Sequence, residues 1–383
     1  MRRHHGGFSL IELLVGVVIG MLMILVIAQV TVGFEGVKRT STSGSDAQSN
    51  GAAAIFLFER EIRMAGYGLV ARGNLVCESG LHAAFKGQRL FNQTLIAPVR
   101  IVDGGSEPDR LVISRANARI GALPTLLIMD KGVDSVTVQS PVGLQSGDLF
   151  LMGGANGGKV CSILQLSANP TFKRLDTGEW VWVMEHKAIS NDATPYNMTP
   201  ATAFDPAVSY AAGDIISSIG TLSLVNYGLH YGTGDTIKRC NSLTAFSPVE
   251  NPTAPTTCND TAVSTLVDDI VYLKARYGVA DAGSQAVNAW VAPTDIWAEG
   301  ALTKDTIRRI KAIRVGVVAR SQQYEREVVT ASCSEETEDK QAKGTLTLWA
   351  DGPTMSLSGE QCHYRYRVFE TTIPIKNVIW GAV

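Results

Sequence analysis

One carboxylate stands alone in the most apolar part of this sequence. Glu12 is the only charged residue between Phe8 and Phe34, and Gln29 is the only other large polar side chain there. A charge in the interior of a bilayer is costly, so it needs a cationic partner. A buried carboxylate and a buried ammonium offset each other's desolvation only when they are paired. We therefore expect Glu12 to have a positively charged partner.

The six cysteines are the second set of residues whose chemistry the sequence indicates. They are spread singly with no CxxC pair, which argues against a zinc ribbon or a redox motif. An even number in a chain that reads as exported predicts disulfides, but many connectivities are open, and some cysteines could instead be free and buried. In order of preference, the expected pairs are Cys240 with Cys258, Cys333 with Cys362 and, by elimination, Cys77 with Cys161.

Little else in the chain could serve an active site. The segment GGANGGK at 153–159 is similar to the start of a phosphate-binding loop, but Val160 stands where serine or threonine would coordinate magnesium, so a hairpin or loop is favoured. The histidines show no HExxH or other ligand spacing, and no G-x-S-x-G elbow occurs. We expect no enzyme, no catalytic residue, no metal site and no cofactor.

Two tryptophans lie on one face of an expected strand. Trp180 and Trp182 are two residues apart, a spacing that suits either stacking on a ligand or packing in a core. We favour the core, which leaves an adhesive surface as a lesser alternative.

Composition sets the class of protein. The chain has 383 residues, 45% of them hydrophobic, which is enough for a large core. The formal net charge of -2 provides no basic field for nucleic acid, so no nucleic-acid partner is expected. Abundant glycine and only 18% charged residues favour strands and loops over long solvated helices.

The apolar run 8–34 predicts a membrane-spanning helix. At 1.5 Å per residue it reaches about 40 Å, enough to cross a hydrocarbon core of about 30 Å. Arg2 and Arg3 precede it, which places the N-terminus in the cytoplasm and the large C-terminal part outside. A secretory signal peptide would need a shorter apolar region and a small-residue cleavage site, and a plain anchor gives no reason for Glu12.

A second helical pattern follows the apolar run. Ile55, Phe58 and Ile62 recur at helical spacing, so residues 52–67 predict an amphipathic helix. Glycines at 33, 36, 44 and 51 each cost about 1 kcal/mol inside a helix, which predicts a bend or frayed segment near 40–50.

From residue 68 onward, short apolar runs between turn residues predict strands, with 334–344 as an exposed polar loop. The runs lie at 111–114, 133–138, 149–152, 160–166, 180–184, 313–317 and 364–368.

The N-terminal residues resemble a known processing signal. Residues 6–13, GGFSLIEL, are similar to the prepilin leader and N-methylation motif of type IV pilins and type II secretion pseudopilins. The resemblance implies that a prepilin peptidase cuts between Gly7 and Phe8 and methylates the new amino terminus of Phe8. It also implies that Glu12 pairs with the terminal amine of a neighbouring Phe8 during assembly.

Six segments of the body carry a second resemblance: 61–67 (EIRMAGY), 109–112 (DRLV), 147–151 (GDLFL), 271–278, 313–321 and 364–377. In this order they resemble the PilW family of minor pilins. That resemblance implies a subunit that helps initiate type IV pilus assembly, in a tip complex with other minor pilins. The alternatives are a J-type minor pseudopilin of type II secretion and, less favoured, an anchored adhesin.

The expected fold class is α+β, with one long N-terminal helix packed on a large β-rich domain. Its expected segments are a leader at 1–7, a transmembrane half of the helix at 8–34, an amphipathic half at 35–67 and a pilin-like domain at 68–383. The expected location is the inner membrane, single-pass with the body in the periplasm, and then the pilus tip. The expected partners are the prepilin peptidase, other pilus subunits and, before assembly, inner-membrane lipid.

Overall fold

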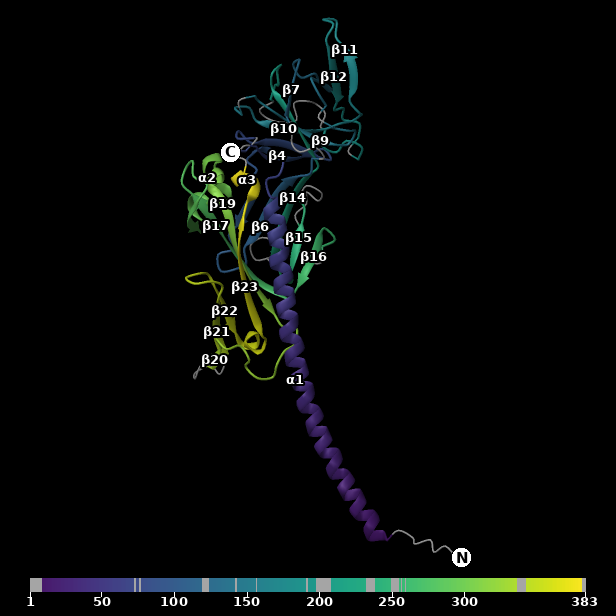
Figure 1. The fold of residues 1–383 in the computed structure, drawn as a ribbon, viewed down its shortest axis with the longest axis vertical. Helices are drawn as coiled ribbons and strands as arrows, with labels where there is room; N and C mark the ends of the chain where they lie inside the picture. The colour runs from purple at the N-terminus through teal and green to yellow at the C-terminus, as the bar shows by residue number, and fades with distance from the viewer. Residues whose placement is uncertain are drawn as a thin grey trace, which may run out of the picture.

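A long helix joined to an elongated β-rich body makes up the molecule (Figure 1). The α+β fold class is therefore confirmed. The structure, a computed structural model, describes residues 9–71, 74–75, 77–118, 124–141, 143–155, 157–190, 192–197, 208–231, 238–248, 255, 257–258, 260–335 and 342–380.

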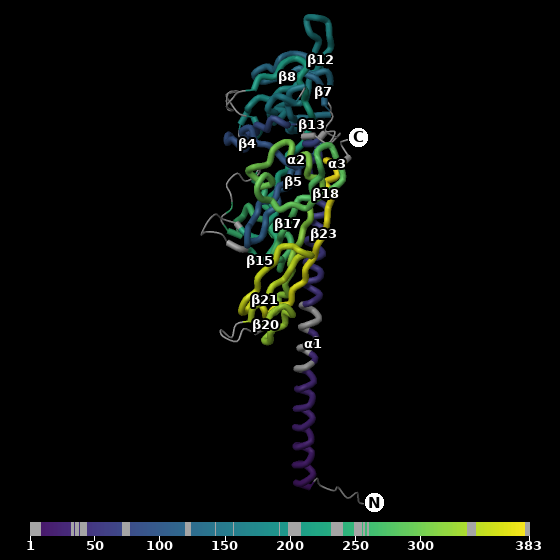
Figure 2. The backbone as a smooth tube through the Cα atoms, turned by 90° about the vertical axis from the view of Figure 1, so that its left-hand side faces the viewer, coloured from purple at the N-terminus to yellow at the C-terminus, as the bar shows by residue number. Residues whose placement is uncertain are grey.

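The helix α1 (Leu10–Met64) is a single element of 55 residues, about 80 Å long. Its N-terminal half projects away from the body, and its C-terminal half lies along the sheets (Figures 1 and 2). The expected bend or frayed segment near 40–50 is wrong as to fraying, since the helix runs through these residues without a break, but the axis of the helix does change direction between its projecting half and its packed half (Figure 1). The free-energy cost of these glycines is outweighed because α1 packs against the body farther along the chain, and this packing stabilises the helix.

One of the helix glycines has a packing reason. A side chain at Gly51 would overlap the ring of Phe369, so glycine lets the helix approach the neighbouring strand closely. A side chain at Gly44, in contrast, would meet nothing within 4 Å. The loss of helix stability that glycine causes at position 51 is therefore offset by closer contact between α1 and the sheet.

The sheet beside α1 is antiparallel and carries much of the main core. The helix packs on its last two strands, with Phe58 and Ile62 completely buried among residues of this sheet and of the next one. In spatial order its strands are β18 (Val287–Val291), β17 (Ile270–Ala280), β19 (Ile310–Arg320) and β23 (Tyr366–Pro374).

A five-stranded sheet faces the same core from the other side. The backbone N–H of Ile101 donates a hydrogen bond of 2.6 Å to the hydroxyl of buried Tyr277, which ties the two sheets together. Its strands in order are β16 (Val263–Asp268), β15 (Lys238–Phe246), β14 (Leu222–Tyr231), β6 (Arg110–Ala116) and β5 (Val99–Val102).

The end of the body farthest from the N-terminus holds two more sheets (Figure 1). The six-stranded sheet has the order β4 (Gln88–Thr94), β3 (Leu81–Phe85), β10 (Cys161–Gln165), β9 (Leu149–Gly153), β13 (Ile215–Gly220) and β7 (Pro124–Leu126). The three-stranded sheet has the order β11 (Thr171–Arg174), β12 (Trp180–Glu185) and β8 (Ser135–Val138).

The segment that is similar to a phosphate-binding loop connects two of these strands. β9 and β10 pair antiparallel, so the segment between them is a hairpin connection, and the hairpin interpretation is confirmed. The ammonium of Lys159 lies 2.5 Å from Asp214 Oδ2 and is engaged in that ion pair. No helix follows the glycines to receive a phosphate, because the chain enters β10.

The expectation that both tryptophans lie in a core is wrong for Trp180. The hairpin of β11 and β12 extends beyond the body, and Trp180 is 59% exposed at its tip. Its ring stacks on that of Phe172 at 4.8 Å. Trp182, two residues nearer the body, does pack against a buried cluster. The face of β12 that carries both tryptophans is covered by the core at Trp182 but not at Trp180. A spacing of two residues shows that side chains share a face, but it does not show how far along the strand the core extends.

The remaining elements are short. The expected loop 334–344 is partly wrong, because strands occupy its two ends, while residues 336–341 lie outside the described residues. One small sheet contains β20 (Ser334–Glu335), β21 (Ala342–Thr347) and β22 (Thr354–Ser358), and another contains β1 (Val70–Ala71) and β2 (Asn74–Leu75). The short helices are α2 (Lys304–Arg309), α3 (Lys376–Trp380) and the 3-10 turns Asp295–Trp297, Glu299–Ala301 and Gly359–His363.

A buried histidine predicts acid sensitivity at the far end of the body. His186 follows β12, its ring lies 6.3 Å from that of Phe150, and its Nε2 has no hydrogen-bond partner. Burial, and then the positive charge of Lys131, lower the pKa of His186 from 6.5 to about 4, against the opposing charge of Asp134. The unfolded chain therefore binds a proton in this pH range more readily than the folded chain, so stability falls as pH drops below 6.5.

Between pH 7 and pH 4.5 we expect the free energy of unfolding to fall by about 2.5 kcal/mol more in the native chain than in His186→Gln. Urea unfolding of both proteins at the two pH values measures this difference. Equal pH dependence in the two proteins would contradict the prediction.

Candidate functional site

The N-terminal end of α1 contains the one predicted assembly residue that the structure describes. Gly7 and Phe8, the expected cleavage and methylation positions, lie outside the described residues. Glu12 is in the first helical turn and accepts a 3.0 Å hydrogen bond from the backbone N–H of Ser9, while Ser9 Oγ accepts one of 3.3 Å from Ile11 N–H. This capping box suits the positive end of the helix dipole. The Glu12 carboxylate is thus hydrogen-bonded to the backbone of Ser9, the residue that directly follows the expected new amino terminus.

The first part of α1 has the length and composition of a membrane span. Leu10–Thr31 covers 22 residues, about 33 Å, and none of it is buried against the rest of the chain. The hydroxyl of Thr31 donates a 2.8 Å hydrogen bond to the Ile27 carbonyl, so this polar group is satisfied inside the helix. A helix of this kind is stable only where lipid or other helices cover it.

The second part of the same helix is built into the core. Ala54, Phe58 and Ile62 are fully buried at helical spacing, which confirms the amphipathic pattern. The Phe58 ring meets the Tyr227 ring edge to face at 6.0 Å, and the Thr371 hydroxyl donates a 3.3 Å hydrogen bond to Glu59 Oε1. The apolar span and the part of the helix that packs in the core therefore belong to one continuous helix.

A buried ion pair that sequence reasoning missed joins the two central sheets. Lys274 Nζ on β17 lies 2.7 Å from Asp109 Oδ1, just before β6, and both side chains are almost fully buried. Asp109 also accepts hydrogen bonds from the N–H groups of Gly104 (3.0 Å) and Ala275 (2.9 Å). Burial raises the pKa of Asp109, and the Lys274 ammonium and these two donors oppose that shift. Nothing in the sequence links two residues 165 positions apart.

Three disulfides cross-link the body. They are the same three pairs that the sequence analysis favoured, with Cα atoms 5.5 Å apart for Cys77–Cys161, 5.7 Å for Cys240–Cys258 and 5.9 Å for Cys333–Cys362. The first connects the chain before β3 to β10, the second connects β15 to the segment before β16, and the third connects the segment before β20 to a 3-10 turn. Such cross-links persist in oxidising compartments.

The described part of the chain shows no cluster of three or more His, Cys, Asp or Glu side chains arranged to hold a metal ion. His363, for example, has its Nδ1 directed at the Glu325 carbonyl at 3.0 Å. What the described residues do contain is an apolar helix, one acidic residue in its first turn and a body cross-linked by disulfides.

Comparison with known proteins agrees with this architecture. Residues 249–377 match the family model of type IV pilus-assembly protein W (PilW), a region that contains the sheet against which α1 packs. Residues 2–28 match the prokaryotic N-terminal methylation motif, which implies processing by a prepilin peptidase. No curated protein and no solved structure gives a significant match. With a methylation motif on a membrane-length helix and a PilW match over residues 249–377, this chain is similar to type IV pilus-related pilins of the PilW type.

Proposed function

We propose that this chain is a minor pilin that helps initiate type IV pilus assembly in a tip complex with other minor pilins. Before assembly it sits in the inner membrane with its body in the periplasm, and it has no enzymatic activity. The observation that carries the proposal is the continuity of α1, whose first half is apolar and unburied while its second half is core. A helix of this kind transfers from lipid to a bundle of like helices without refolding the body.

The size of the body supports a specialised rather than a bulk subunit. The β-rich part spans several sheets and more than 300 residues, so each copy adds a large mass outside the helix bundle. An apical hairpin and a lateral small sheet further extend it (Figure 1). Such a shape suits a position where neighbours do not close in on every side, as at a filament end.

A deletion strain tests the proposal directly. Loss of surface pili and of twitching, restored by the native gene, is the expected result. Intact pili together with a defect in protein secretion would instead assign the chain to a type II secretion pseudopilus, as a J-type minor pseudopilin. Intact pili and intact secretion would reject both assignments.

Glu12→Ala is expected to leave cleavage between Gly7 and Phe8 intact but to lower incorporation into pili by about tenfold or more. The reason is that an unpaired amino terminus in an apolar helix bundle costs more than the ~1.4 kcal/mol that corresponds to a factor of ten. Mass spectrometry of the N-terminus measures cleavage, and quantitative immunoblotting of sheared pili measures incorporation.

Ser9→Ala is the matched control, because it removes the other half of the same capping box without removing the charge. We expect near-normal incorporation for Ser9→Ala. Equal loss in both variants would mean that helix capping, and not the charge, is what assembly requires. An uncleaved N-terminus in native cells that contain the peptidase would reject pilin processing itself.

A further inference from the structure

The hairpin of β11 and β12 carries an aromatic face that extends beyond the core. Phe172 lies opposite Trp182 across the two strands and Arg174 lies opposite Trp180, so these side chains share one face. The core covers this face at Trp182, whereas Phe172 is 54% exposed and Trp180 is 59% exposed. The hairpin lies at the end of the body farthest from the N-terminus (Figures 1 and 2). Neighbouring apolar side chains left uncovered in this way are typical of a binding surface.

The two exposed rings are stacked on each other. The Phe172 and Trp180 ring centroids are 4.8 Å apart, with an angle of 13° between the ring planes. Phe172 also meets the Trp182 ring at 5.0 Å, which connects the exposed rings to the core. One face of the Trp180 indole is therefore supported by Phe172, and the described residues place no other ring against the indole. An indole held in this way presents a flat apolar face to a ligand.

The tip of the hairpin is formed before any ligand arrives. The N–H of Leu175 donates a 2.8 Å hydrogen bond to the Glu179 carbonyl, and the N–H of Gly178 donates one of 2.9 Å to the Leu175 carbonyl. Arg174 Nε donates a 3.2 Å hydrogen bond to the Gly178 carbonyl, which restrains the guanidinium on the strand position opposite Trp180. Within the described chain Arg174 forms no ion pair, so its terminal N–H groups are available as donors. Little ordering of the site is needed when a ligand binds.

The charges of the hairpin balance. In residues 171–180 the cations Lys173 and Arg174 are matched by the carboxylates of Asp176 and Glu179, so the segment has no net charge. A polyanion or an anionic lipid surface therefore gains no electrostatic attraction from it. All four side chains are exposed, which brings hydrogen-bond donors and acceptors together at the tip. An uncharged ligand with many hydroxyl groups matches this combination of polar groups and ring faces.

The size of the face also selects among ligands. A stable protein interface takes about 800 Å² and about 20–30 residues from each partner, whereas the segment 171–180 has ten residues. Lys173 and Arg174 lie on β11, an edge strand, where charged side chains disfavour the addition of a strand from another protein. A sugar ring, in contrast, is covered by a single indole and needs only a few polar side chains beside it.

We propose that the hairpin face formed by Phe172, Arg174 and Trp180 binds an uncharged saccharide. The C–H groups of one sugar ring stack on the open face of Trp180, which Phe172 supports from behind. The Arg174 guanidinium donates hydrogen bonds to hydroxyl groups at the edge of that ring. This binding goes beyond the proposed function and does not depend on it; only the position of the hairpin at a filament end rests on that proposal.

Calorimetry with uncharged oligosaccharides tests the proposal. The full chain, in micelles of lauryldimethylamine oxide because this detergent has no sugar headgroup, is titrated separately with cellohexaose, chitohexaose and maltohexaose. We expect at least one of them to bind, and Trp180→Ala to weaken binding about tenfold or more because the stacking surface is lost. Trp180→Phe keeps a ring and should weaken binding less. The matched control is Tyr324→Ala, which removes a ring that is 52% exposed and stacked on His363 at 4.9 Å outside the hairpin, and which should leave binding unchanged.

Several outcomes would overturn the proposal. These are no binding of any of the three sugars at millimolar concentration, native affinity in Trp180→Ala, or equal weakening by Tyr324→Ala. Tighter binding of an anionic oligosaccharide, with hexagalacturonate as the probe, would show that the hairpin selects charge and would contradict an uncharged ligand.

Experiments in cells separate this inference from the proposed function. A Trp180→Ala strain that makes native amounts of pili but adheres less to a surface coated with the bound sugar supports both. Loss of pili in that strain, without sugar binding by the native chain, would make the hairpin a contact between subunits, which overturns the saccharide inference and leaves the minor pilin proposal standing. If the deletion strain keeps its pili, the minor pilin proposal fails, and calorimetry still decides the saccharide inference.

Discussion

Asp109→Ala is expected to lower the free energy of unfolding by about 3 kcal/mol, because it removes the nearer carboxylate from the buried Lys274 ammonium. The Gly104 and Ala275 N–H groups lose their acceptor as well. Lys274 keeps a 2.8 Å hydrogen bond to the Gly105 carbonyl and a longer contact, 3.6 Å, with the partly exposed Asp103 carboxylate, which compensates its charge only in part. Urea unfolding of the full chain in detergent, followed by tryptophan fluorescence, measures the loss.

Two further variants show whether the buried pair is the cause. Replacing both partners, Asp109→Leu with Lys274→Met, should recover much of the loss because no unpaired charge remains buried. Lys187→Ala breaks an exposed pair with Glu185 and should change stability by less than about 1 kcal/mol. A loss below about 1 kcal/mol for Asp109→Ala would mean that water or Asp103 compensates Lys274 and that the buried pair adds little to the attachment of the two sheets.

The second large effect is expected for the disulfide with the longest loop. Replacing Cys77 and Cys161 with alanine should lower the free energy of unfolding by about 4.5 kcal/mol, because the bond closes a loop with a sequence separation of 84. The reduced chain gains conformational freedom in its unfolded state, and that gain grows with the logarithm of loop length. Chemical unfolding under oxidising conditions measures the difference.

The pair Cys240–Cys258 provides the matched control. Its sequence separation is 18, so the same replacement should cost only about 3 kcal/mol. Both variants should behave like the native chain once a reducing agent has opened all three bonds. Equal costs, or a larger cost for the shorter loop, would mean that local packing around the sulfur atoms, and not loop closure, sets the contribution.

Features with a local period or a local composition could be predicted from the sequence. The apolar run and the spacing of Phe58 and Ile62 indicated both halves of α1. Alternating runs indicated strands such as β19 and β23, whose register the structure then defines. The cysteine pairs followed from spacing and chain order, since each of two pairs closes a short loop.

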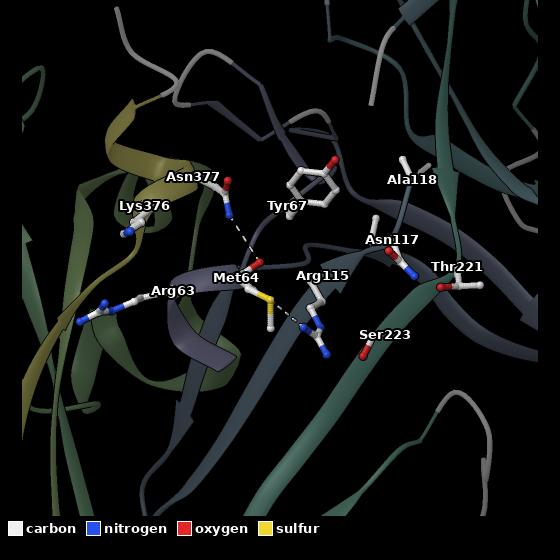
Figure 3. A pocket seen from close by; sticks show the side chains of 11 residues that line it. Arg63, Met64, Tyr67, Arg115, Asn117, Ala118, Thr221, Ser223, Lys376 and Asn377 are labelled. Atoms are coloured by element: carbon white, nitrogen blue, oxygen red, sulfur yellow. Dashed lines mark hydrogen bonds between the residues drawn. The ribbon is translucent and has the colours of Figure 1, made fainter. Parts of the chain in front are cut away.

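Features that depend on distant partners could not be predicted. The continuity of α1 through its glycines depends on contacts with β23, and the close approach at Gly51 depends on where Phe369 lies. Trp180 is exposed because the hairpin of β11 and β12 extends beyond the rest of the body. A cavity at the C-terminal end of α1 gathers residues from distant parts of the sequence (Figure 3), so neither Arg115 nor Lys376 had a visible relation to Arg63.

The alignment of α1 with β23 determines how the molecule carries load. The C-terminal half of the helix runs beside this strand (Figure 2), the Thr371 hydroxyl donates a hydrogen bond to Glu59, and the Phe369 ring lies against Gly51. Tension applied through the N-terminal end of the helix therefore acts parallel to these contacts and loads them together in shear. Peeling would break them one at a time at much lower force. We therefore expect a pull along the helix axis to separate the body from its anchor less readily than a pull across that axis.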